Sequence, residues 1–353
     1  MSQYWSNLVS RLQPYTPGEQ PQVDSLIKLN TNENPYGPSP LVLKALRDTA
    51  SADLRKYPDP NAQQLKDALA QYHNLQSNQV FVGNSSDEVL AHAFRALLKH
   101  DQPLLFPDLT YSFYPVYCRL FDINYTQIPL APDFSIRVED YSQDAGGIIF
   151  ANPNAPTGIL LSLDKISWLA EQHPNTVIVV DEAYVDFAGT SAVSLINQLP
   201  NLLVCQTYSK SRCLAGLRVG MAFGQAHLIE GLERVKNSFH PYALGQLAIA
   251  GAVASLSDQA YFADCLVNIN KTRATTTKAL ISLGFEVLPS QANFVLAQHP
   301  SHSGADLFAY LRANKIIVRH FDHPRIKNYL RISIGTEAQM QTLIRTLQKR
   351  CQA

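Results

Sequence analysis

The chain has 353 residues, and 29 Lys and Arg balance 29 Asp and Glu, so its formal net charge at pH 7 is zero. With 46% hydrophobic and 16% charged residues it can bury one large core or two, which excludes a disordered tail and a small disulfide-stapled module. The balanced charge lacks the basic excess of nucleic-acid and membrane-surface binders, so we expect a small-molecule partner, no nucleic acid and no membrane.

The cysteines and the N-terminus indicate the compartment. Five cysteines are scattered through the chain without a C-x-x-C pair, and no histidine lies in a metal-ligand spacing such as H-E-x-x-H. Neither a disulfide framework nor a metal site is therefore expected. The first residues have no basic start followed by an apolar core, and no stretch reaches the roughly 18 apolar residues of a membrane span. We expect a cytoplasmic protein.

Short, continuous apolar runs alternate with helical patterns between about residues 60 and 225. This alternation predicts an α/β fold with a mainly parallel sheet covered by helices on both faces. Several runs end directly in polar or glycine-containing segments, and ligands of such folds bind beyond the carboxyl ends of the strands. The runs are 80–82, 104–106, 147–151, 176–180, 202–206 and 219–223.

The last third of the chain predicts a second, smaller α/β domain. A closely packed helix is expected at about 243–256 and a long connecting helix at 259–283, and strands at 285–297, 315–321 and 330–335 precede a final helix from Glu337. A further helix is expected at 305–312. We therefore expect an N-terminal segment, 1–50, that joins the small domain and closes over the substrate, a large domain, 51–265, and a small domain, 266–353.

The segment GNSSDE, at 83–88, follows the first run. Ser85 and Glu88 have the spacing of a capping box, which by itself predicts only a well-capped helix. A helix N-terminus at a strand end also offers free N–H groups and a positive dipole to a phosphate. Taken alone, this signal is weak.

Three further residues follow buried runs. Asp181 ends the run TVIVVD, where an unpaired charge is expensive, so its carboxylate needs a cation, either a structural Arg or Lys or a protonated ring nitrogen. Lys210 follows another run, and burial there would supply the free amine that forms a Schiff base. Arg218 comes eight residues later and can clamp a phosphate. Each residue alone is more simply a surface or structural charge; together they indicate a site.

Nine segments in order resemble the fold-type I enzymes that use pyridoxal phosphate, the group of aspartate aminotransferase, and within it the class II histidinol-phosphate aminotransferases. Any one segment is a weak match, but nine in the right order are specific and span nearly the whole chain. They are LNTNENPYGPSP (29–40), KYPDP (56–60), GNSSDE (83–88), PDLTYSFY (107–114), NPNAPTG (152–158), DEAY (181–184), YSKSRCLAGLRVG (208–220), SQANFVL (290–296) and LRISIGT (330–336).

The resemblance implies a pyridoxal 5'-phosphate cofactor and three catalytic residues. Lys210 matches the lysine that binds the cofactor and then moves a proton at the substrate Cα. Asp181 would pair with the pyridinium nitrogen, and Tyr184 would donate a hydrogen bond to the ring oxygen.

The resemblance also implies further cofactor contacts. Tyr111 would stack on the pyridine ring. The phosphate would be held by four residues of this chain and by Tyr57 of a neighbouring subunit, which implies a homodimer. Those four residues are Ser86, Asp87, Ser209 and Arg218.

For the substrates, Arg331 matches the arginine that binds an α-carboxylate, and Arg319 lies where this group commonly has an arginine for the substrate phosphate. Histidinol phosphate has no α-carboxylate, so Arg331 would serve glutamate and the phosphate-bearing substrate in the same pocket. Asn32 and Tyr36 resemble positions that face the substrate. The implied reaction is transamination of histidinol phosphate with 2-oxoglutarate, which gives imidazole-acetol phosphate and glutamate in histidine biosynthesis.

Two positions depart from the pattern of the family. Ala155 occupies the place where an Asn commonly contacts the ring oxygen, so either Asn154 supplies that contact or Tyr184 acts alone. Ser85 replaces a common Gly, and if that position needs a positive φ, Ser costs some strain.

Other functions remain open. A broad aromatic amino-acid aminotransferase and a threonine-phosphate decarboxylase share the fold and the lysine, and the sequence separates them poorly. A nucleotide-dependent oxidoreductase or another phosphate-binding α/β protein lacks its fingerprint here, since neither G-x-G-x-x-G after an early strand nor G-x-x-x-x-G-K-[ST] occurs. A non-catalytic member of the fold would be expected to have lost Lys210 or Asp181.

Overall fold

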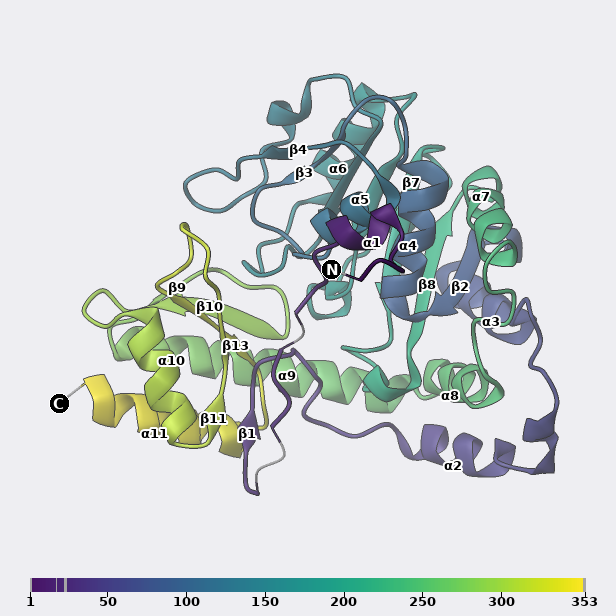
Figure 1. The fold of residues 1–353 in the computed structure, drawn as a ribbon. Coiled ribbons are helices and arrows are strands. Elements are labelled where there is room, and N and C mark those ends of the chain that lie inside the picture. Colours follow the sequence, from purple (N-terminus) through teal and green to yellow (C-terminus); the bar gives the residue numbers. More distant parts are fainter. Residues whose placement is uncertain (1, 17, 22–23, 352–353) are drawn as a thin grey trace.

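The computed structural model describes residues 2–16, 18–21 and 24–351 (Figure 1). Its large sheet has the strand order β2-β8-β7-β6-β5-β3-β4. The pairs from β7 to β4 are parallel, whereas β8 runs antiparallel to both of its neighbours. The strands are β2 (Val80–Asn84), β3 (Leu104–Pro107), β4 (Tyr125–Ile128), β5 (Gly147–Ala151), β6 (Ile178–Asp181), β7 (Leu202–Thr207) and β8 (Val219–Gly224).

All six predicted apolar runs form strands, and the α/β class with a mainly parallel sheet is confirmed. Their side chains alternate between two buried faces, which explains why the runs are apolar throughout. Val179 packs in the core on one face, and Ile178 and Val180 pack in the core on the other. Strand β4 was missed because it lies at the sheet edge, and its sequence, YTQI, is largely exposed.

Helices cover both faces of the large sheet (Figure 1). Helices α4, α5 and α7 contribute to the core of one face, and α3, α6 and α8 contribute to the core of the other. Short helix α1 (Asn7–Arg11) lies near the N-terminus. The remaining bounds are α2 (Pro40–Thr49), α3 (Gln63–His73), α4 (Ser85–Leu97), α5 (Tyr114–Phe121), α6 (Leu163–Gln172), α7 (Ala226–Asn237) and α8 (Gln246–Ser257).

A smaller sheet has the order β12-β13-β10-β9, all antiparallel, and a separate parallel pair joins β1 to β11. The long helix α9 runs beneath this part of the molecule from the large sheet (Figure 1). The elements are β1 (Ile27–Lys28), α9 (Gln259–Ser282), β9 (Glu286–Val287), β10 (Phe294–Gln298), α10 (Gly304–Ala313), β11 (Ile316–Ile317), β12 (Arg319–His320), β13 (Tyr329–Ser333) and α11 (Glu337–Cys351).

The N-terminal segment divides between the two sheets. Leu29 packs in the core of the small sheet, together with Ile332 and Leu343. Val42, on α2, packs instead in a core of the large sheet with Ile249 of α8. Residues 1–50 therefore do not pack as one unit against the small sheet.

The start of α4 differs from the capping box that the sequence indicates. Asn84 is the N-cap residue, and Glu88 reaches back to accept its backbone N–H at 2.5 Å. Ser85 is the first helical residue and has a φ of 72°, so this position does have the positive φ that favours glycine. An added Cβ at Gly220 would lie 2.3 Å from the Ser85 carbonyl carbon, so only glycine lets β8 approach the start of this helix so closely.

The register explains why distant segments meet. Asn84 at the end of β2 pairs with Val219 at the start of β8, and Gly220 pairs with Thr207 at the end of β7. The start of α4, the segment after β7 and the loop before β8 therefore share one edge of the sheet, where β6 also ends at Asp181.

Among the described residues, no helix is both long and apolar enough to cross a membrane.

Candidate active site

A cavity of about 150 Å³ lies at this carboxyl edge. It is lined by residues from several separate segments at the ends of strands of the large sheet. They are Ser86, Asp87, Tyr111, Ala151, Ala155, Asp181, Ala183, Tyr184, Thr207, Ser209, Lys210 and Arg218. The structure thus brings together eight of the residues that the sequence singles out.

Asp181 is the most deeply buried charge in this cavity, with 4% of its surface exposed. Its Oδ2 accepts a hydrogen bond from the Tyr114 hydroxyl at 3.0 Å. Its Oδ1 is buried and has no hydrogen-bond partner among the residues that the structure describes. Burial raises the pKa of Asp181 to about 6, although the Tyr114 bond acts in the opposite direction. A cation or a strong donor placed in the cavity would satisfy the free oxygen.

Lys210 is held against the N-terminal segment. Its Nζ donates to the Thr31 carbonyl at 3.0 Å and lies 6.0 Å from the centre of the Tyr184 ring. The Asn34 side chain donates to the carbonyls of Lys210 and Ser211, both at 3.1 Å. The amine is therefore oriented by residues that lie about 180 positions earlier in the chain.

One end of the cavity is suited to an anion. The N-terminus of α4 faces it, and helix N-termini attract anions through free N–H groups and the helix dipole. Arg218 lies beside this terminus and forms an ion pair with Asp87 at 2.7 Å. The Ser209 hydroxyl accepts a hydrogen bond from Thr207 at 3.0 Å.

Tyr111 connects the two ends of the cavity. Its hydroxyl donates to Asp87 at 3.1 Å, and its ring lies edge-on to Tyr114 with centroids 5.7 Å apart. Burial raises the pKa of Tyr111 well above its ordinary value, and the Asp87 carboxylate adds to the shift. Tyr111 therefore stays neutral and presents an aromatic wall.

Tyr184 and Asn32 form a buried contact between the two sheets. The Asn32 amide donates to the Tyr184 hydroxyl at 2.9 Å, and its Oδ1 accepts from Ser333 of β13 at 2.8 Å. Asn32 is 1% exposed and lines neither this cavity nor the larger one described next, so its role toward a substrate stays a prediction. It positions Tyr184, because both ends of its side chain are occupied.

A second cavity, of about 490 Å³, adjoins the first and shares Tyr111 and Ala155 with it. Arg319 and Arg331 line it from neighbouring strands, where they are directly paired across β12 and β13. Arg331 donates to the Asn30 carbonyl at 2.8 Å, and its buried Nε has no partner in the described ranges. Within the described part of the chain, neither arginine has an acidic partner within salt-bridge distance.

Three expected site residues lie elsewhere. Asn154 lines neither cavity, because its amide is occupied by the Leu109 carbonyl at 2.9 Å and by the Thr110 hydroxyl. Tyr36 is half-buried, packs against the core of the small sheet, and also lines neither. Tyr57 is 80% exposed and stacks on Tyr242, with centroids 4.6 Å apart.

Sequence reasoning missed four contributors to the site. Tyr114 orients Asp181, Asn34 and the Thr31 carbonyl hold Lys210, and Thr207 holds Ser209. Three of these residues lie inside the segments LNTNENPYGPSP and PDLTYSFY, which carry the resemblance to the family. Their polar side chains were a signal, but their partners lie far away in the sequence.

The pKa of Asp181 gives a prediction for the protein without a bound ligand. The ordinary value is 3.8 and the folded-state value about 6, so the folded state holds the proton more tightly than the unfolded state. The contribution of protonated Asp181 to the free energy of unfolding is therefore fully present below about pH 4 and is lost as the pH rises through about 6. We expect Asp181→Asn to stabilise the unliganded protein at pH 8 by about 1–3 kcal/mol, and to have little effect at pH 4.

Urea unfolding of both proteins at the two pH values measures this difference. Burial also raises the pKa of the neighbouring Glu182, to about 7, but both proteins contain Glu182, so the comparison cancels its contribution. Equal destabilisation of the variant at both pH values would contradict the prediction.

Comparison with known proteins agrees with this geometry. Residues 24–347 match the family described as aminotransferase class I and II. The chain is 58% identical to histidinol-phosphate aminotransferase 1 of Methylococcus capsulatus, over 98% of this chain and 97% of that protein. It is 57% identical to histidinol-phosphate aminotransferase 1 of Pseudomonas aeruginosa, over 98% of this chain and 99% of that protein.

Solved structures show the same fold. The histidinol-phosphate aminotransferase of Sinorhizobium meliloti, in complex with pyridoxal-5'-phosphate, superposes with a TM-score of 0.90 at 23% identity, over 100% of this chain and 98% of that one. The enzyme of Clostridium acetobutylicum gives a TM-score of 0.86 at 24% identity, over 93% and 99%. The chain therefore belongs to the class I and II aminotransferases and, within them, to the histidinol-phosphate aminotransferases.

Proposed function

We propose that this chain is a pyridoxal-phosphate-dependent transaminase that converts histidinol phosphate and 2-oxoglutarate to imidazole-acetol phosphate and glutamate, in histidine biosynthesis. The relatives at 55–58% identity support this substrate, since all are named for it. The observation that carries the proposal is the unpartnered Oδ1 of Asp181, which lines one cavity with Lys210.

The cavity fits the cofactor in its donor set. Asp181 would hold the ring nitrogen and favour its protonated form, and this N–H would give the buried Oδ1 a hydrogen-bond partner. Tyr111 provides a flat face for the ring, and Tyr184, held by Asn32, donates to the ring oxygen without help from Asn154. When bound, the cofactor supplies an electron sink for the charge that develops at the substrate Cα.

The cofactor phosphate would bind at the N-terminus of α4. The backbone N–H groups of Ser86 and Asp87, the Ser209 hydroxyl and Arg218 would hold it. Two observations support this: all four residues line the same cavity, and Gly220, which has no side chain, lets the start of α4 pack directly against β8.

Lys210 has two roles. Its amine would hold the cofactor covalently, and as a free amine it would accept and return the proton at the substrate Cα. The Thr31 carbonyl, which accepts a hydrogen bond from Nζ, supports the second role because it keeps the free amine inside the site.

The second cavity binds the substrate. Arg331 binds the α-carboxylate of glutamate, and Arg319 binds the phosphate of histidinol phosphate. Two guanidinium groups that are adjacent and unpaired with carboxylates repel each other, which favours the binding of an anion between them.

With 2-oxoglutarate as acceptor, we expect kcat/KM to be far higher for histidinol phosphate than for phenylalanine. Threonine phosphate is expected not to be decarboxylated.

Lys210→Ala lowers activity by about 10³-fold or more, because one residue serves two steps. Coupled assays of glutamate formation measure both. Equal rates with phenylalanine would indicate a broad aromatic aminotransferase, and carbon dioxide release from threonine phosphate would indicate a decarboxylase.

A matched pair of substrates isolates Arg319. Arg319→Gln lowers kcat/KM for histidinol phosphate by about 10–100-fold, the range for a lost charge-assisted hydrogen bond, and leaves the value for histidinol, which has no phosphate, unchanged. If both substrates lost the same factor, Arg319 would have a structural role only.

We propose that the large domain comprises about 51–265 and the small domain about 266–353, with the N-terminal segment shared between them. The two sheets and their separate cores support this division. Five cysteines without a disulfide support a reducing cytoplasm as the compartment.

We further propose a homodimer in which Tyr57 reaches the cofactor phosphate of the partner subunit. Tyr57, Phe239 and Leu54 are exposed to 80%, 81% and 48%, and exposed aromatic groups of this kind are typical of interfaces. In its own chain, Tyr57 does not line the cofactor cavity.

Co-expression of two deficient variants tests this sharing. A mixed dimer of Tyr57→Ala and Lys210→Ala subunits contains one site with both residues intact, so about a quarter of all sites recover in an equal mixture. Activity above that of either variant alone is expected. No recovery in mixed dimers confirmed by sedimentation would show that Tyr57 does not act across an interface.

A further inference from the structure

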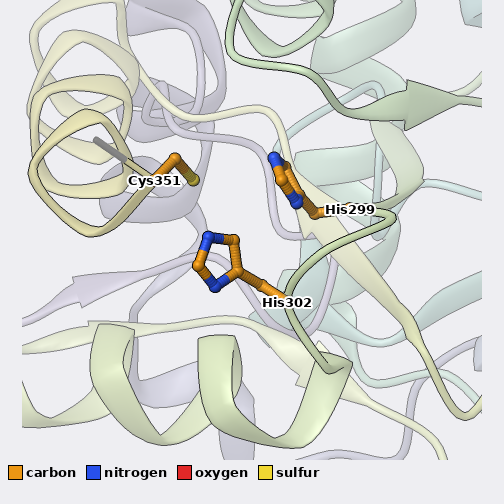
Figure 2. A group of neighbouring side chains, drawn as sticks. All are labelled: His299, His302 and Cys351. Carbon is orange, nitrogen blue, oxygen red and sulfur yellow. The ribbon is translucent and has the colours of Figure 1, made fainter. Parts of the chain in front are cut away.

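A cluster of three metal-binding side chains lies outside both cavities (Figure 2). His299 and His302 come from the turn after β10, and Cys351 is the last residue of α11. One ligand atom from each lies within 4.8 Å of the other two, and all three residues are half-buried. Figure 2 shows the three side chains directed toward one another.

The turn itself brings the two histidines together. His299 and His302 form an isolated antiparallel bridge, and the His302 N–H donates to the His299 carbonyl at 3.4 Å. This tight turn, H-P-S-H, directs both rings to the same side, with centroids 4.7 Å apart. In this turn the spacing H-x-x-H is therefore sufficient to bring the two imidazole rings together, although it differs from the helical metal-binding spacing H-E-x-x-H.

Two of the three side chains, those of His302 and Cys351, are free to bind a metal ion. In the part of the chain that the structure describes, neither the His302 ring nor the Cys351 thiol makes a side-chain hydrogen bond. The Nε2 of His299 lies 3.2 Å from the Leu283 carbonyl, and its Nδ1 accepts the Ser301 N–H at 3.1 Å. A backbone carbonyl behind one ring nitrogen is the arrangement that orients a ligating histidine.

Both ring nitrogens of His299 are engaged, so its Nδ1 can bind an ion only when the Ser301 N–H, which lies at the surface, turns to water. We propose that His299, His302 and Cys351 bind a zinc ion, with water as the fourth ligand. Two imidazoles and a thiolate are the nitrogen and sulfur donors that zinc prefers, and four-coordinate geometry is usual for it. The thiol proton leaves to the buffer as the sulfur–zinc bond forms.

The ion would connect the end of α11 to the small sheet. Leu343 and Leu347 hold α11 in the core of this sheet, but Cys351 packs only at its margin. A bond from Cys351 to the β10 turn fixes the last helical turn to Leu283 at the end of α9 through His299. The role is structural and does not depend on the proposed reaction.

Cobalt is the probe, because a tetrahedral cobalt site with a sulfur ligand has strong visible absorption and a sulfur-to-cobalt charge-transfer band. Chelator-treated, untagged holoenzyme is titrated with Co²⁺. We expect one cobalt per chain with this spectrum, its loss on addition of Zn²⁺, and a higher Tm in the presence of Zn²⁺. His302→Ala and Cys351→Ser each weaken binding by about ten-fold or more.

His227→Ala provides the matched control, because His227 is an exposed histidine on α7 outside the cluster, and it should bind cobalt as the natural chain does. Circular dichroism without metal verifies that each variant is folded. Absence of the tetrahedral spectrum in the natural chain would overturn the proposal. A spectrum that persists unchanged in His302→Ala and Cys351→Ser would also overturn it, because the cobalt ion would then be bound at another site, such as the cofactor.

Discussion

The buried carboxylate of Asp181 is the constraint on which the site depends. A charge at the end of a central strand, with one oxygen unpartnered, makes the unliganded protein less stable at neutral pH. The proposed cofactor removes this cost because a protonated ring nitrogen satisfies that oxygen. The same interaction would therefore drive cofactor binding and keep the ring in the protonation state that transamination needs.

The topology of the large sheet brings the phosphate-binding segments and the lysine segment to the same edge as that carboxylate. Because β8 runs antiparallel between β2 and β7, the start of α4, the lysine segment and Arg218 meet at one edge. The N-terminal segment then closes the site from the other sheet, through Thr31 to Lys210 and through Asn32 to Tyr184. Binding and catalytic groups are thus attached to a rigid sheet, and the contacts that hold them cross between the two parts of the molecule.

The strands of the large sheet could be predicted because a strand buried on both faces leaves a continuous apolar run, which is a local pattern. Asp181 and Lys210 could be predicted for the same reason, since each lies at or just after the end of such a run. Arg218 directly precedes the run 219–223 and was indicated by its spacing from Lys210. The role of Asn32 could not, because its partner Ser333 lies 301 residues away. The contacts of the Asn154 amide with Leu109 and Thr110 could not be predicted because only the folded loop shows them, and the His299–Cys351 cluster exists only in three dimensions.

The protonation state of the cofactor ring tests the central claim most directly. The holoenzyme would be prepared with pyridoxal phosphate labelled with ¹⁵N in the ring, and the chemical shift of that nitrogen recorded at pH 8. The account predicts a protonated nitrogen in the natural chain and an unprotonated one in Asp181→Asn. An unprotonated nitrogen in the natural chain, or the same shift in both proteins, would contradict it.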